Sequence, residues 1–72
     1  MSTLKVLFGK RLQVLRREAG MTQERLAERI DLTVESVSNI ERGVFGPKFD
    51  TLEKIAAVLG VRVKALFEFG EE

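Results

Sequence analysis

The chain has 72 residues, of which 44% are hydrophobic, and its 12 basic and 11 acidic side chains give a net charge of +1. A chain of this length suits one domain rather than two. It contains neither cysteine nor histidine, which excludes disulfides, zinc fingers and catalytic triads of the serine or cysteine type. We therefore expect no catalytic residues, no metal site and no cofactor.

The distribution of charged and apolar residues bears on partners and location. Residues 1–17 carry five basic side chains and no acidic one, whereas residues 18–46 carry six acids and three bases. A solvated helix face explains the basic segment as well as a binding surface does. No apolar run approaches the ~20 residues that a membrane span needs, and residues 1–8 lack the long apolar stretch of a signal peptide. We expect a cytoplasmic protein with no membrane segment.

The first predicted helix covers residues 4–19. Its apolar residues recur at spacings of four, three and four, which place them on one helical face: Phe8, Leu12, Leu15 and Ala19. Gly20 follows this segment, and Gly43 and Gly60 follow two later ones, where helices commonly end in a left-handed residue.

Two short helices are predicted next, over residues 23–30 and 34–42. Thr22 and Thr33 stand before them, where a threonine hydroxyl can cap a helix. The residues between them, 31–33, break the apolar pattern. The side chains predicted to face inward are Leu26, Ala27 and Ile30 in the earlier helix, and Val37 and Ile40 in the later one.

The last two predicted helices, over residues 50–59 and 63–68, follow a loop with the turn signal Gly46-Pro47. Asp50 and Glu53 could form a pair similar to a capping box at the start of the earlier one, and the cap could also lie one or two residues before Asp50. The apolar residues predicted to face the core are Leu52, Ile55, Ala56 and Leu59, then Leu66 and Phe67. The pattern as a whole predicts an all-α fold of five short helices in a single domain, residues 1–72, with its core over residues 8–68.

Residues 23–42 form two helices of about eight residues around a three-residue turn, a spacing typical of a helix-turn-helix. Two helices that cross at a short turn approach closely, which suits a small residue such as Ala27. Leu32 can fill the gap between them, while Val37 and Ile40 anchor the later helix from beneath. Asp31 occupies a turn position that favours a left-handed backbone, which Asp tolerates better than most residues.

These features resemble the phage-repressor (lambda-type, Xre) helix-turn-helix family from Phe8 to Phe67. The matching stretches are residues 9–12 (GKRL), 15–16 (LR), 20–24 (GMTQE), 26–27 (LA), 37–43 (VSNIERG), Pro47, 51–56 (TLEKIA), 59–61 (LGV) and 66–67 (LF). Two positions depart from the family pattern: Asp31 replaces the usual glycine, and Val44-Phe45 occupies loop positions that are often basic or polar. The resemblance implies a lambda-repressor-like fold and binding to double-stranded DNA.

The free face of the helix over residues 34–42 carries the candidates for reading bases: Val34, Glu35, Ser38 and Asn39. Asn can pair with adenine through two hydrogen bonds, Glu can accept from the cytosine amino group, and Val can contact a thymine methyl group. Simple solvent exposure remains the alternative for each of them.

Candidate contacts to the DNA backbone lie around this helix: Gln23, Thr33, Arg42, Lys48, Arg11 and Arg17. For Gln23 the contact is implied by the resemblance, and it begins a helix whose N–H groups attract phosphate. Thr33 can cap a helix as well as, or instead of, contacting phosphate, and solvated charges explain the four cations equally well. The resemblance also implies a partly buried, structural ion pair between Arg16 and Glu41.

The sequence thus predicts a sequence-specific DNA-binding regulator, such as a repressor, a restriction–modification controller or an antitoxin-like autoregulator. We expect it to bind a pseudo-palindromic operator as a homodimer, because one such domain makes few contacts. Two segments are candidates for the dimer interface, the last helix with its tail and the N-terminal segment. Their apolar residues are Val61, Val63, Phe67 and Phe69 in the former, and Leu4, Val6 and Leu7 in the latter. Phe45 and Phe49 are expected in the core or the dimer contact. The alternative is a protein-interaction module on the same fold that does not read DNA, and an enzyme is the third hypothesis.

Overall fold

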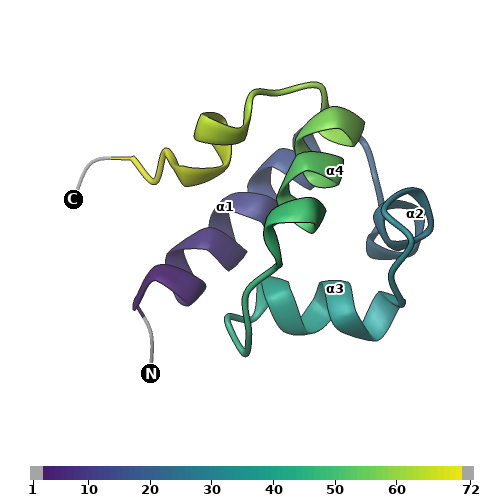
Figure 1. Ribbon diagram of the computed structural model, residues 1–72, viewed down its shortest axis with the longest axis horizontal. Helices are drawn as coiled ribbons and strands as arrows, with labels where there is room; N and C mark the ends of the chain where they lie inside the picture. Colours follow the sequence, from purple (N-terminus) through teal and green to yellow (C-terminus); the bar gives the residue numbers. More distant parts are fainter. Residues whose placement is uncertain (1–2, 71–72) are drawn as a thin grey trace.

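The computed structural model describes residues 3–70, and these form four α-helices and one 3-10 helix (Figure 1). The elements in chain order are α1 (Thr3–Glu18), α2 (Gln23–Arg29), α3 (Val34–Glu41), α4 (Phe49–Leu59) and η1 (Val63–Phe67). Residues 1–2 and 71–72, which belong to the expected domain of residues 1–72, lie outside the described residues. The part of the chain that the structure describes is helical without strands, as predicted.

The prediction of a fifth α-helix is wrong in helix type, because residues 63–67 form a 3-10 helix. The N–H of Ala65 donates to the carbonyl of Arg62, three residues earlier, over 2.9 Å. A segment this short gains few α-helical hydrogen bonds, and the tighter helix is common in pieces of this length. An apolar pair such as Leu66 and Phe67 fits either helix type, so the pattern did not separate them.

All four α-helices end in the same arrangement, in which a residue with positive φ lets the chain reverse. Gly20, Asp31, Gly43 and Gly60 occupy this position, with φ between 63° and 77°. In each case the next residue donates its N–H to a carbonyl five residues earlier, as Leu32 does to Ala27 over 2.9 Å. This is the Schellman motif. Asp31 therefore adopts the left-handed conformation that the sequence predicts for it.

The threonine caps predicted for α2 and α3 are confirmed, because the hydroxyl of Thr22 accepts from the N–H of Arg25 and that of Thr33 accepts from the N–H of Ser36. For α4 the alternative of an earlier cap is confirmed, and Asp50 and Glu53 form no capping box. The helix begins at Phe49 after its N-cap Lys48, which lies two residues before Asp50 and makes no side-chain cap bond. Asp50 instead lies in the first turn, where a carboxylate still interacts favourably with the helix dipole.

One hydrophobic core joins all five elements. Its members are Phe8, Leu12, Leu15, Leu26, Ala27, Ile30, Val37, Ile40, Leu52, Ile55, Ala56 and Leu66. Leu59 was also expected to face the core, and it is half-buried and packs against it. Ala19 and Phe67 carried the same expectation, but both are exposed, although the ring centroid of Phe67 lies 5.3 Å from that of Phe8. None of the helices in residues 3–70 combines the length and the apolar character that crossing a membrane requires.

Candidate nucleic-acid interface

The pair of helices α2 and α3 is held in a fixed relative position by buried side chains and by the turn between them. The two helices pack against each other, and Leu26, Ala27 and Val37 are all buried in the core that they share. Asp31 sets the direction of the turn through its positive φ. Figure 1 shows α3 along one edge of the molecule, with α1 and α4 on its inner side. The opposite side of α3 therefore faces away from the core.

The side chains predicted to read bases lie on this outer side of α3. Val34 and Glu35 are exposed in the first turn, and Ser38 and Asn39 are half-buried in the next. Val37 and Ile40, which alternate with them along the helix, are buried in the core. Since the buried residues fix the rotation of the helix, the four candidate side chains are presented together on one face.

Asn39 is linked to the end of α3 by a hydrogen bond that sequence reasoning did not anticipate. Nη2 of Arg42 donates to Oδ1 of Asn39 over 2.5 Å. The two residues are three apart on the helix, a spacing that brings side chains together. The bond occupies one lone pair of the amide oxygen and places a guanidinium beside the side-chain amide of Asn39. The end of this face therefore presents hydrogen-bond donors from Asn39 and Arg42, and the carboxylate of Glu35 lies one turn before them.

A buried ion pair ties the end of α3 to α1. Nε of Arg16 lies 2.7 Å from Oε2 of Glu41, and Nη2 donates to Oε1 over 3.1 Å. The side chains are 8% and 1% exposed. Nη1 of Arg16 also donates to the carbonyl of Met21, in the loop that leads to α2. The arginine thus joins α1, α3 and the approach to α2 at one point.

Gln23 takes part in the same network. Its Nε2 donates to Oε1 of Glu41 over 2.9 Å, and the side chain is half-buried. The sequence predicted a contact to the DNA backbone for this amide and did not foresee a partner within the protein. The NH₂ group has two hydrogens, and the bond to Glu41 uses one of them. The first residue of α2 is thereby fixed against the last residue of α3.

Gly9 allows α1 to approach the end of α3 closely. A Cβ atom at this position would lie 2.5 Å from the carbonyl oxygens of both Ile40 and Glu41. Both of these are backbone atoms, which cannot move aside as a flexible side chain can. The sequence contained a signal for this contact, a glycine in the interior of a helix, where it costs stability unless packing requires it.

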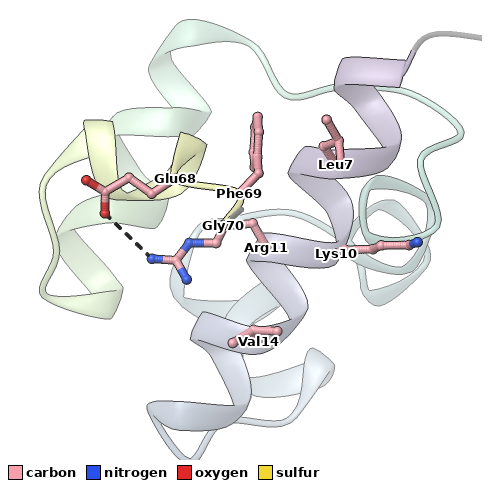
Figure 2. A pocket seen from close by; sticks show the side chains of 7 residues that line it. All are labelled: Leu7, Lys10, Arg11, Val14, Glu68, Phe69 and Gly70. Atoms are coloured by element: carbon pink, nitrogen blue, oxygen red, sulfur yellow. Dashed lines mark ion pairs between the residues drawn. The ribbon is translucent and has the colours of Figure 1, made fainter. Parts of the chain in front are cut away.

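Arg11, expected to contact phosphate, lies on a different side of the molecule. Its Nε donates to the carbonyl of Ala65 over 2.8 Å, and its Nη2 lies 3.9 Å from Glu68. Figure 2 shows the guanidinium in the hollow between α1 and the segment after η1. Arg11 is two residues from Gly9, about 200° around the helix, so it faces away from α3. We therefore drop it from the candidate DNA contacts.

The remaining candidate contacts are accessible. Thr33, Arg42 and Lys48 are exposed around the two ends of α3 and the loop that follows it, and Arg17 is exposed in the last turn of α1. Thr33 also caps α3 and donates to the hydroxyl of Ser36 over 3.0 Å. Capping and contact with an outside group are compatible, because the residue itself remains exposed.

The arrangement of α2, the turn and α3 agrees with a comparison against known families. Residues 12–66 match the family model described as Helix-turn-helix. The chain belongs to this family. Its relatives identify the helix-turn-helix as the lambda or Xre type, as the sequence predicted.

Two curated relatives and one crystal structure illustrate this membership. The helix-turn-helix chain is 38% identical to the control protein C.BamHI of Bacillus amyloliquefaciens over 94% of its own length and 85% of that protein. It is 39% identical to the immunity repressor protein of Bacillus phage phi105, of which it spans 43%. The structure of the restriction-modification controller protein C.AhdI from Aeromonas hydrophila aligns with a TM-score of 0.84 at 35% identity, over 88% of this chain and 96% of that one.

Proposed function

We propose that this helix-turn-helix chain is a transcriptional regulator that binds double-stranded DNA and reads it with α3 in the major groove. The observation that carries the proposal is the outer face of α3, where Val34, Glu35, Ser38 and Asn39 stand together on a helix whose rotation the core fixes. An α-helix fits the major groove, where each base pair presents a distinct pattern of donors, acceptors and methyl groups. Membership of the family supports the same conclusion.

The bond between Arg42 and Asn39 favours particular partners on the bases. Arg42 occupies one of the two lone pairs of Oδ1, whereas the NH₂ group of Asn39 carries two hydrogens that can be donated. Acceptors on the major-groove edge, such as N7 and O6 of guanine, match this set of donors. We propose that Asn39 reads such an acceptor through its NH₂ group. This differs from the two-bond contact with adenine that the residue type alone indicated.

Contacts with phosphate fix the position of the protein without reading sequence. We assign them to Thr33, Arg42, Lys48 and Arg17. Gln23 joins this group in a supporting role, because one hydrogen of its NH₂ group donates to Glu41 and the other can donate to a phosphate oxygen. Glu41 and Arg16 would then act indirectly, by holding Gln23 at the start of α2.

We further propose that the protein acts as a homodimer on a pseudo-palindromic operator. Several apolar side chains of the two candidate interface segments are exposed, namely Leu4, Val63 and Phe67, and others are half-buried, namely Val6, Leu7, Val61 and Phe69. Dimers of this class bind two half-sites about one helical turn apart, so a two-fold axis in the protein calls for one in the DNA. The half-sites recovered by selection from random duplexes should therefore be inverted repeats.

The second candidate function, a protein-interaction module, is favoured by one observation. Val44 and Phe45 are exposed in the loop after α3, where basic or polar residues would suit phosphate better. The salt dependence of binding to duplex DNA separates the two functions. Contacts with phosphate release counterions, so affinity should fall steeply with salt, with a slope of about −0.9 per phosphate neutralised on a double-logarithmic plot. Binding to duplex DNA that is undetectable even at low salt would contradict the regulator and favour the interaction module.

A further inference from the structure

Phe49, the first residue of α4, is the most exposed large hydrophobic side chain among residues 3–70, with 85% of its surface accessible. It contributes nothing to the core of its own chain. A large aromatic side chain in this position is unfavourable in water unless another surface covers it. The sequence placed Phe49 in the core or in a dimer contact, and this exposure rules out the core.

Apolar hollows lie on both sides of this phenylalanine. One, of about 200 Å³, is lined mainly by Leu4, Phe8, Pro47, Leu52 and Phe67. The other shares Leu52 and Phe67 and adds Val63, with Asp50 and Glu53 at its rim. Phe49 borders both and forms a ridge between them. We call Phe49 and these two hollows the Phe49 surface.

We propose that the Phe49 surface is the contact between two copies of this chain, with Phe49 of each copy entering an apolar hollow of the other. This inference rests on the homodimer proposed above and assigns its interface. A two-fold pair places the same patch of both chains in contact, so the patch must complement itself. The Phe49 surface does so, because it carries both a protruding ring and a hollow of a size suited to receive one.

The charge at the rim argues against DNA as the occupant of this surface. Asp50 and Glu53 line one hollow and are both exposed, and Lys5 lines the other, so this surface has no excess of positive charge that would attract phosphate. Stacking of bases on Phe49 would also need a basic groove to guide a single strand. A second copy of the chain meets neither obstacle, since its own apolar hollow accepts the ring while the acidic side chains stay at the solvated edge.

The position of the surface also suits binding to two half-sites. In Figure 1 the first turns of α1 and the helix η1, which help to line the hollows, lie in the left half of the molecule, and α3 runs along the lower edge. Suppose that a second copy is related to this one by a two-fold axis that runs vertically in the picture, at the left of the molecule. The α3 helices of both copies would then lie along the same lower edge. The molecule is 31 Å long, so the two copies would be spaced by about one turn of DNA, which is ~34 Å.

The test compares Phe49→Ser with Val14→Ser by sedimentation over a range of protein concentrations. Val14 is an exposed valine on α1 that borders a different hollow, next to Arg11 (Figure 2). We expect the wild-type chain and Val14→Ser to be dimers and Phe49→Ser to be a monomer. Far-ultraviolet circular dichroism should show all three to be folded, because neither side chain is part of the core.

Three results would overturn the inference in distinguishable ways. A dimeric wild type with a dimeric Phe49→Ser would leave the homodimer standing and reject this surface. A wild type that is monomeric at every concentration, with and without duplex DNA, would reject the homodimer itself. Chemical cross-linking gives a second readout that keeps Phe49 intact, since the chain has no cysteine of its own. A short bismaleimide should link two Asp50→Cys chains and not two Val14→Cys chains, and the reverse pattern would also reject the surface.

Discussion

Arg16 and Glu41 carry opposite charges that are almost entirely removed from water, with side chains 8% and 1% exposed. Such a pair is held by its geometry, and each partner depends on the other to offset the cost of burial. Glu41 accepts from Gln23 as well as from Arg16, and Arg16 also binds the carbonyl of Met21. The loss of either charge would therefore disturb three elements at once.

We predict that Arg16→Met lowers the free energy of unfolding by about 3–5 kcal/mol, the cost of leaving a buried carboxylate unpaired. Arg17→Met is the matched control, since Arg17 is its exposed neighbour, and such changes usually stay within about 0.5 kcal/mol. Denaturant midpoints of the two variants and the wild type provide the measurement. Equal midpoints for Arg16→Met and Arg17→Met would contradict a stabilising role for the pair.

Gly9 lies where α1 closely approaches the end of α3. In Gly9→Ala the added methyl group would overlap the carbonyl oxygens of Ile40 and Glu41. Forcing an extra carbon into a packed contact costs about 1–3 kcal/mol, which exceeds the roughly 0.5–1 kcal/mol that alanine gains over glycine inside a helix. We expect a net loss of stability on thermal or denaturant unfolding. Lys10→Ala, at the exposed next position, should be nearly neutral, and an equally stable Gly9→Ala would show that the helices can separate without cost.

At the scale of elements, the turn between α2 and α3 decides how the candidate recognition helix is presented. Asp31 holds this turn with φ of 63°, a conformation that costs an L-residue roughly 1–2 kcal/mol. Asp31→Gly should therefore raise the stability by about 0.5–1 kcal/mol, after the greater freedom of glycine in the unfolded chain is subtracted. Chemical denaturation checks this, with Asp31→Ala as the comparison, which should be less stable than Asp31→Gly. A less stable glycine variant would show that the Asp31 side chain itself supports the turn.

The elements that were predicted well are those whose signals are local. Four α-helices follow from apolar spacing, and their ends follow from Thr22, Thr33 and the residues with positive φ. The start of α4 was predicted only to within two residues, because Lys48 caps it without a side-chain hydrogen bond, whereas the carboxylate of Asp50 lies in the first turn instead. The helix type of η1 was missed because so few residues carry no distinct period.

Contacts between distant residues were predicted only in part. The pairing of Arg16 with Glu41 was expected from family resemblance, and the structure contains it. The bonds of Gln23 to Glu41 and of Arg11 to Ala65 join residues that are 18 and 54 positions apart, and no local pattern reports such contacts. The bond between Arg42 and Asn39 is local, but a spacing of three permits it without requiring it.

For the whole molecule, the proposed division between base reading and backbone contact predicts how affinity changes on different duplexes. Lys48 is exposed at the start of α4 and is assigned to phosphate. Lys48→Ala should weaken binding to any duplex by a similar factor and reduce the salt slope by about one. Titrations at two salt concentrations measure both quantities. An unchanged slope would remove Lys48 from the phosphate contacts.

The most direct test of the central claim, that α3 reads bases in the major groove, is the affinity of Asn39→Ala for two duplexes. One carries the site selected from random DNA by the wild-type protein, and the other carries the same bases in scrambled order. Loss of a base contact should cost about 1–3 kcal/mol on the selected site and relax the preference at one base pair. Binding to the scrambled duplex should hardly change, because phosphate contacts dominate there. A variant that binds both duplexes as the wild type does, or loses affinity equally for both, would contradict the placement of α3 in the groove.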